Sequence, residues 1–359
     1  MQTRRFTAPL SRPLETARGP IRERRGHLVA VGPEPGDGVE TNGIGEATPL
    51  SGWTESPAAC ASALASGRPA RAVLDGLDPR ETPAARHGVS LALADASSRA
   101  DGRPLAAHLA DGAGLSSPAR SVPVNATIGD GSPTETAAAA SRAVDGGTTC
   151  LKLKVGARSV DADVRRLRAV RDAVAPAVEV RADANGAWDL ETAHRALDRL
   201  EPMDLAYVEQ PLPATELAST ARLARESAVS IAVDESLAEH GVDAVLAADA
   251  ADVVVLKPMA LGGPDRTVDA AVRARDAGVE PVVTTTIDAV VARTAAVHVA
   301  AAIPNVSACG LATAGLLEED LAADPCPVEA GWVSVPDGPG LAGDAFDGLV
   351  DSVGGHDRG

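Results

Sequence analysis

The sequence predicts an α/β protein built around a TIM-type barrel, and two observations carry this prediction. From about residue 122 to 315, short strands rich in Val, Ile and Leu alternate with amphipathic helices rich in Ala, Arg and Asp. The strand candidates recur at nearly regular intervals, which is the pattern of consecutive βα units. In order, the expected strands are 122–128, 150–155, 178–184, 205–209, 229–234, 252–257, 281–286 and 306–311.

A doubly wound open sheet is the alternative to the barrel. Such a sheet usually carries a Gly-rich nucleotide turn after its first strand. The turn in that place here, Gly129-Asp130-Gly131-Ser132, is a poor match. The barrel is therefore the preferred interpretation.

The residues outside the repeat predict an appendage to the barrel. Residues 1–121 combine strand-like pieces, Gly/Pro-rich turns and two helical stretches, which predicts a separate α+β unit. The barrel is expected over residues 122–324. The remaining segment, 325–359, is rich in Gly, Pro and Asp, and its length suits packing back on the first unit.

Charge and lysine content are both unusual. The 359 residues carry a net charge of −17, with 50 acidic residues against 33 Lys and Arg, of which only three are lysine. Such a surface repels nucleic acid and anionic membranes, so neither is an expected partner. The acid excess predicts adaptation to high salt, as in a halophilic archaeon. A GC-rich genome is the alternative, but it explains the scarce lysines and not the acids.

Salt should therefore stabilise this protein. We expect a higher melting temperature in molar KCl or NaCl than in dilute buffer, because the Debye length falls to roughly 3 Å at 1 M salt and screens like-charge repulsion. Thermal unfolding across a salt series measures this effect. A melting temperature that falls or stays level as salt rises would contradict halophilic adaptation.

The four cysteines and the absence of apolar runs predict a cytoplasmic location. Cys60, Cys150, Cys309 and Cys326 are scattered without a Cys-x-x-Cys motif, as in proteins with reduced thiols. No uncharged apolar run reaches the roughly 18 residues that span a bilayer. The amino-terminal residues have no apolar signal core. The oligomeric state is left open.

All three lysines fall on strand candidates, among acids at neighbouring strand ends. In a TIM barrel, functional groups lie at the carboxyl ends of the strands. Residues two apart on a strand share a face. In strand order the residues are Lys152 and Lys154, Asp183 and Asn185, Glu209, Asp234, and Lys257. A single acid at a strand end is usually a helix cap or solvated, but an ordered set on successive strands predicts a site.

The composition of this set indicates metal-assisted proton transfer. Asp183, Glu209 and Asp234 would repel one another without a cation, and oxygen ligands select Mg²⁺, with Mn²⁺ as a substitute. Lysines on opposite sides of that metal suit removal of a proton α to a carboxylate. A small-molecule carboxylate is the expected substrate. Glu235 points to the opposite face from Asp234 and is expected to be supporting or structural.

The motifs resemble those of the enolase superfamily, in its muconate-lactonizing subgroup. The matching segments, in order, are Lys152-Leu-Lys154, Asp183-Ala-Asn185, Val208-Glu209-Gln210-Pro211, Asp234-Glu235-Ser236 and Lys257-Pro258. The resemblance implies an enolase-type modified barrel, (β/α)7β, with an amino-terminal capping domain completed by the carboxyl-terminal tail. Residues 43–53, ending in Trp53, resemble the loop that covers the substrate in that family.

The resemblance also assigns roles to the site residues. It implies that Asp183, Glu209 and Asp234 hold Mg²⁺ and that Lys154 is the principal acid/base. It places Lys257 opposite Lys154 and makes Lys152 a supporting cation.

Within the subgroup, the covering loop and the last strands favour o-succinylbenzoate synthases. The loop pattern Gly-x-Gly-Glu-Ala-x-Pro-Leu-x-Gly and the segment 308–317 are similar to theirs. The eighth strand lacks the Asp-x-Asp of dipeptide epimerases and the glutamate of muconate cycloisomerases. An N-acylamino-acid racemase is the main alternative. A barrel that binds without catalysis is a third, although retention of all three lysines argues against it.

Residues that touch the substrate are expected from four places. Asn185 lies beside the metal ligands, and a turn at Gly262 and Gly263 could bring backbone near a substrate carboxylate or could be a tight βα turn. The seventh strand ends Thr284-Thr-Thr-Ile-Asp288, where synthases usually have Ser-Ser-x-Glu-Ser. The expected contacts on the last two strands are Thr285, Thr286, Gly310 and Leu311.

Overall fold

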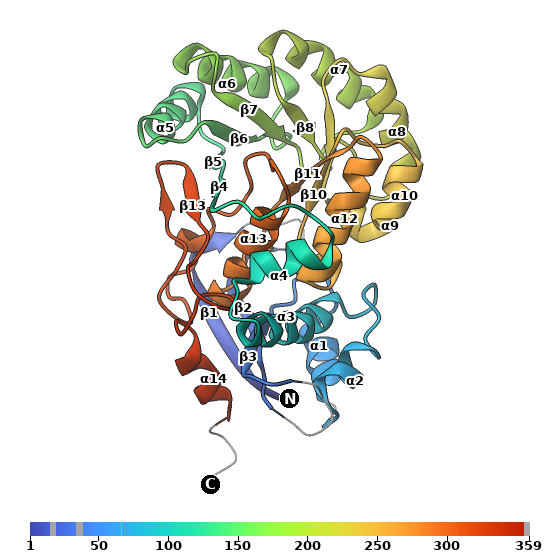
Figure 1. Cartoon of the computed structure of the whole chain (residues 1–359). Coiled ribbons are helices and arrows are strands. Elements are labelled where there is room, and N and C mark those ends of the chain that lie inside the picture. Colours follow the sequence, from blue (N-terminus) through green and yellow to red (C-terminus); the bar gives the residue numbers. More distant parts are fainter. Residues whose placement is uncertain (15–18, 34–38, 66, 355–359) are drawn as a thin grey trace.

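The computed structural model describes residues 1–14, 19–33, 39–65 and 67–354 (Figure 1). Its central feature is one curved sheet of seven parallel strands in the order β11-β10-β9-β8-β7-β6-β5. The strands are β5 (Ala126–Ile128), β6 (Cys150–Lys154), β7 (Glu179–Asp183), β8 (Tyr207–Glu209), β9 (Ile231–Val233), β10 (Val253–Leu256) and β11 (Glu280–Val283). Chain order thus matches spatial order, and the predicted barrel-type fold is confirmed.

Helices lie outside this sheet and connect its strands (Figure 1). They are α5 (Pro133–Asp145), α6 (Val160–Ala173), α7 (Leu190–Leu200), α8 (Leu217–Glu226), α9 (Glu235–His240), α10 (Val242–Ala247), α11 (Pro258–Leu261), α12 (Pro264–Asp276) and α13 (Val290–Ala302), with 3-10 turns η1 (Glu201–Met203) and η2 (Ala314–Leu316). Side-chain oxygens of Ser132, Ser159 and Asp189 cap α5, α6 and α7. Strands β8, β9 and β10 are buried throughout, as expected of parallel strands covered on both faces.

The last expected strand is much shorter than predicted. In the described structure the backbone of segment 306–311 pairs with the sheet through isolated parallel bridges, Val124 with Cys309 and Thr284 with Gly310. The Thr284 hydroxyl donates to the Gly310 carbonyl at 2.9 Å. A Cβ at position 310 would lie 2.4 Å from that hydroxyl oxygen, which explains the glycine.

The amino-terminal residues form an antiparallel sheet covered by helices, here called the N-terminal unit. Its elements are β1 (Gln2–Leu14), β2 (Ile21–Val31), β3 (Gly43–Ala47), α1 (Pro57–Leu64), α2 (Ala70–Leu74), α3 (Pro83–Ala100) and α4 (Leu105–Gly112). Helix α3 packs directly on β3. A Cβ at Gly45 would lie 2.0 Å from the Gly88 carbonyl oxygen, so this approach requires glycine.

The carboxyl-terminal segment runs from the barrel back to the N-terminal unit. Strand β13 (Trp332–Ser334) pairs with β12 (Val328–Glu329) on one side and with β4 (Ser121–Pro123) on the other. The expected strand 122–128 is therefore divided into two pieces, β4 and β5. Helix α14 (Asp347–Gly354) contacts β1, β2 and β3 (Figure 1). In the described parts of the chain, no helix combines the length and apolar character needed to cross a bilayer.

A buried carboxylate joins the N-terminal unit to the barrel. Glu46 of β3 is fully buried, and its carboxylate accepts hydrogen bonds from the backbone N–H groups of Ala289 at 2.8 Å and Ala292 at 2.9 Å. These groups belong to the first turn of α13, so a side chain from one unit caps a helix of the other. Burial raises the pKa of Glu46 to about 7, and the nearby Asp288 adds to this rise.

The raised pKa of Glu46 predicts a pH-dependent stability. The folded protein holds this proton up to a pH of about 7, whereas the unfolded chain loses it near 4.5. The free energy of unfolding should therefore fall as pH rises through this window, by an amount of about 3 kcal/mol for this group. Glu46→Gln should remove the decrease in the free energy of unfolding that is due to this group. Urea unfolding of both proteins at several pH values measures it, and identical pH slopes would contradict the assignment.

Candidate active site

The register of the sheet brings the predicted polar residues to one edge. Lys154 is the lateral partner of Asp183, and Asp183 is the lateral partner of Glu209. Asp234 follows the last residue of β9, and Lys257 follows β10. Parallel strands end at the same side of the sheet, so all five residues lie at the carboxyl ends of neighbouring strands.

Lys154 lies between the acid cluster and the open side of the site. Its ammonium donates to Asp183 Oδ2 at 2.7 Å and to Asn185 Oδ1 at 2.7 Å. Its side chain is 41% exposed, compared with 14% for Lys152. Among the three lysines it is therefore the one most accessible to a ligand.

Lys152 lies deeper and bridges two acids. Its ammonium contacts Glu209 Oε1 at 3.0 Å and Oε2 at 3.1 Å, and Asp183 Oδ2 at 3.1 Å. Burial alone would lower the pKa of Lys152, but attraction from Glu209 and Asp183 outweighs it and holds the pKa well above its usual value. The contacts of Lys152 with two carboxylates suit an electrostatic role for this lysine.

Lys257 occupies the other side of the cluster. Its ammonium donates to Asp234 Oδ2 at 2.6 Å. It also lies over the ring of Trp53, at 3.1 Å from the ring centroid, which is a cation–π contact. The N-terminal unit thus reaches into the site and covers this lysine.

The three carboxylates are almost fully buried. Burial opposes ionisation of Asp183, but Lys152 and Lys154 hold its pKa well below the usual range. Burial raises the pKa of Glu209 to about 7, and repulsion from Asp183 adds to the rise. Burial likewise raises the pKa of Asp234 to about 6, against the attraction of Lys257. Burying these acids so close together is unfavourable for their charged forms, and a further cation would relieve it.

The donor set fits a hard divalent cation. All three acids offer oxygen ligands, and Asp234 Oδ1 is buried without a hydrogen-bond partner. As the described side chains stand, no three Asp, Glu, His or Cys groups converge on one point. The Lys152 ammonium lies between Asp183 and Glu209, and the Lys257 ammonium is paired with Asp234. Asp183, Glu209 and Asp234 would hold the ion after a rotation of these side chains.

Two positioning contacts surround the acids. The Gln210 side-chain oxygen accepts from the backbone N–H groups of Asp234 at 3.0 Å and Ser236 at 3.1 Å, and thereby fixes the end of β9. Glu235 accepts from the Asn185 amide at 3.0 Å, and so supports the partner of Lys154. Sequence reasoning did not identify Gln210 as a site residue, although it lies inside the Val-Glu-Gln-Pro motif.

Gly262 and Gly263 pack closely against the N-terminal unit. A Cβ on Gly262 would meet Pro79 and Arg86, and one on Gly263 would meet Ser90. Both glycines have positive φ, 86° and 147°, and end helix α11 against the N-terminal unit. These contacts fit the tight-turn alternative, and an approach of this backbone to a substrate carboxylate stays a prediction.

The threonines expected to touch a substrate already have partners within the protein. Thr285 and Thr286 are buried, and the Thr285 hydroxyl lies 3.1 Å from the Thr313 hydroxyl. The Thr286 hydroxyl donates to the Asp288 carboxylate. Gly310 is half-buried beside Thr284, and Leu311 is buried. A direct role for these residues in substrate binding stays a prediction.

Comparison with known proteins identifies the family. A family model described as Enolase C-terminal domain-like matches residues 135–344, more than half of the chain. The chain belongs to the enolase superfamily. Within this superfamily, the o-succinylbenzoate synthase of Thermobifida fusca (strain YX) is 44% identical over 210 residues, which cover 57% of this chain and 63% of that protein. The match therefore spans less than two thirds of the relative's length.

Solved enolase-superfamily structures resemble nearly the whole chain. A dipeptide epimerase from Methylococcus capsulatus, complexed with Mg and the dipeptide L-Arg-D-Lys, has a TM-score of 0.80 at 27% identity, covering 95% of this chain and 98% of that one. An N-succinyl Arg/Lys racemase from Bacillus cereus ATCC 14579 has a TM-score of 0.83 at 22% identity, covering 98% of each chain, which is a likeness of fold alone.

Proposed function

We propose that this protein is an o-succinylbenzoate synthase, a lyase of menaquinone biosynthesis. It would dehydrate 2-succinyl-6-hydroxy-2,4-cyclohexadiene-1-carboxylate to 2-succinylbenzoate. The observation that favours this reaction over dipeptide epimerisation is the uncharged segment Ala308–Leu311, which has no acid to hold a substrate ammonium group. Identity of 44% to the Thermobifida fusca synthase supports the same reaction.

The site residues divide into a metal-binding set and a proton-transfer set. We propose that Asp183, Glu209 and Asp234 hold Mg²⁺, with Mn²⁺ as a substitute. When bound, the ion supplies positive charge to the substrate carboxylate as negative charge develops there. Lys152 adds a second fixed cation beside Glu209 and Asp183.

Lys154 is proposed as the base because it is the most exposed lysine of the site. In its neutral form its amine takes the proton from the ring carbon that bears the carboxylate. The bond to the ring hydroxyl then breaks, and the proton can pass to the departing oxygen so that one water leaves and Lys154 is neutral again. The electron pair of the broken C–H bond becomes part of the aromatic ring. Lys257 lies across the acid cluster and contributes charge to the opposite face.

An N-acylamino-acid racemase is the second candidate. It would use the same proton abstraction, followed by return of a proton to the other face of the carbon. The lysines on opposite sides of the acid cluster suit this reaction equally. The uncharged Ala308–Leu311 segment does not separate the two, since an acylated amine carries no charge.

Direct observation of the product tests the proposed function. The purified protein with Mg²⁺ is given the cyclohexadiene carboxylate, and the reaction is followed by proton NMR. We expect the diene signals to be replaced by those of an aromatic ring, with loss of one water per molecule. A substrate that persists unchanged under these conditions, with the fold intact by circular dichroism, would contradict the proposal.

A further inference from the structure

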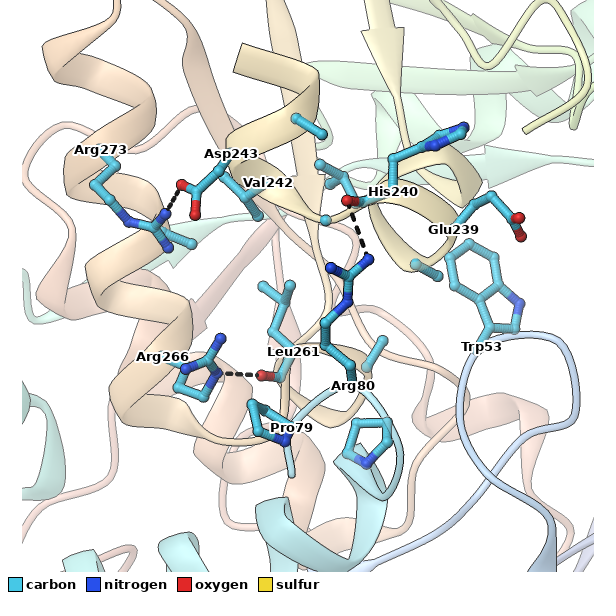
Figure 2. Close-up of a pocket in the computed structure, with 17 residues that line it drawn as sticks. Trp53, Pro79, Arg80, Glu239, His240, Val242, Asp243, Leu261, Arg266 and Arg273 are labelled. Atoms are coloured by element: carbon cyan, nitrogen blue, oxygen red, sulfur yellow. Dashed lines mark hydrogen bonds and ion pairs between the residues drawn. The ribbon is translucent and has the colours of Figure 1, made fainter. Parts of the chain in front are cut away.

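A cavity of about 480 Å³ lies beside the candidate active site, between the N-terminal unit and the outer helices of the barrel. Figure 2 shows it between the Pro79–Arg80 loop and Trp53 on one side and the residues of α9, α10 and α12 on the other. Nothing in the function proposed above uses this cavity. Its position at a junction of two units is typical of ligand sites.

Trp53 separates the cavity from Lys257. Trp53, Leu237 and Leu261 line the cavity, and the same residues line a small adjoining space of about 10 Å³ that also borders Asp234 and Lys257. The Trp53 ring lies directly over the Lys257 ammonium and borders both spaces. Displacement of this side chain would uncover the lysine on this side.

Two guanidinium groups in the cavity have N–H donors that are available to a ligand. Arg80 makes one side-chain hydrogen bond, from Nη2 to the His240 carbonyl at 3.3 Å, and Arg266 donates from Nε to the Leu261 carbonyl at 2.9 Å (Figure 2). Among the described residues, neither guanidinium is paired with a carboxylate. Arg273, by contrast, is paired with Asp243 and Asp269.

The charge of the cavity is opposite to that of the protein. Its lining carries three arginines against two carboxylates, Glu239 and Asp243, on a chain whose net charge is −17. An anion approaching the molecule is repelled by most of its surface and attracted here. Guanidinium groups with free N–H donors bind carboxylates in particular, because their fork matches the two oxygens.

We propose that this cavity is an entry vestibule for dicarboxylate substrates, in which Arg80 and Arg266 capture a carboxylate before the ligand passes Trp53 to reach Lys257. The inference rests on the proposed function for the identity of the substrate, since its succinyl group supplies a second carboxylate. Capture outside the reaction centre should appear in the encounter step and leave the chemical step unchanged.

The test uses succinate as a dicarboxylate probe and three variants of the full chain. Arg80→Gln and Arg266→Gln each remove one guanidinium that is not paired with a carboxylate of any described residue. Arg195→Gln removes an exposed guanidinium of α7, paired with Glu191, and controls for the change in overall charge. Arg80 and Arg266 are exposed, so folding should be retained. Succinate binding is measured by calorimetry at constant ionic strength, with chloride as the balancing anion.

We expect each vestibule variant to bind succinate roughly tenfold more weakly than the wild type, and Arg195→Gln to match the wild type. With the cyclohexadiene substrate, kcat/KM should fall by a similar factor in the two variants while kcat is retained. Succinate affinity that is unchanged in both variants, or lowered equally by Arg195→Gln, would overturn the vestibule.

The binding experiment also separates this inference from the proposed function. If the wild type fails to dehydrate the diene but the two variants still lose succinate affinity, the result supports the vestibule and contradicts the proposed function. If the wild type is active and neither arginine substitution changes succinate affinity or kcat/KM, the result supports the proposed function and contradicts the vestibule.

Discussion

Lys154→Arg should abolish turnover while the fold is retained. Arginine preserves the positive charge beside Asp183 and Asn185, but it cannot lose a proton near neutral pH and so cannot act as the base. Loss of a general base typically lowers a rate by roughly 10² to 10⁴. The measurement is kcat with saturating Mg²⁺, accompanied by the melting temperature.

A matched variant separates charge from base chemistry at this site. Lys152→Arg keeps a cation at the position that the structure assigns to a fixed charge, bridging Glu209 and Asp183. It should therefore lose less activity than Lys154→Arg. Activity of Lys154→Arg within about tenfold of the wild type would contradict the assignment of Lys154 as the base.

Removal of the metal should be the second change with a very large effect. The protein stripped by a chelator should be inactive and should recover with Mg²⁺ or Mn²⁺, because Glu209 and Asp234 are buried acids that a bound cation would keep charged. Asp183→Asn, Glu209→Gln and Asp234→Asn should each weaken metal binding. We expect each substitution to lower the metal affinity by more than the roughly 10- to 100-fold that is typical when a residue hydrogen-bonded to a metal ligand is replaced.

Titration of Mn²⁺ by calorimetry measures these affinities without reference to activity. Glu280→Gln is the control, because Glu280 begins β11 at the opposite end of the barrel and is paired with Arg275. This variant should bind Mn²⁺ as the wild type does. Full activity after complete removal of metal, or unchanged Mn²⁺ affinity in the three ligand variants, would contradict the proposed metal site.

Much of the barrel could be predicted because its signals are local. Buried parallel strands read as continuous Val/Ile/Leu runs, and β9 and β10 have this pattern and lie inside the predicted ranges. The juxtaposition of Lys154, Asp183 and Glu209 followed from the same logic, since consecutive parallel strands end at one edge. The lateral pairing of these three residues matches that expectation.

The features that were wrong or missed depend on contacts between distant segments. The segment 306–311 has strand-like composition, but its backbone pairs with the sheet through isolated bridges instead of a continuous ladder. Gly262 and Gly263 have a turn signal, yet only the tertiary structure shows that helix α3 packs against them. In the same way, nothing local to Trp53 indicates that its ring lies over Lys257.

Side-chain pairing inside the site was also beyond the reach of sequence. The motifs identify which acids and lysines meet, but they do not say that Lys152 bridges Glu209 and Asp183 or that Lys257 pairs with Asp234. Those contacts arise because a buried charge is unfavourable unless it is paired with an opposite charge. An origin in a halophilic archaeon likewise stays a prediction, which the salt dependence of the melting temperature tests.

The central claim is that this site dehydrates the cyclohexadiene carboxylate in preference to racemising N-acylamino acids. The most direct measurement gives the same Mg²⁺-loaded enzyme both substrates and compares kcat/KM, since discrimination between substrates is expressed in that ratio. We predict that dehydration is the faster reaction, with racemisation weak or absent. Racemisation faster by a factor of about ten or more would contradict the proposed function, and would leave the roles of Lys154 and the metal in place because both reactions begin with the same proton abstraction.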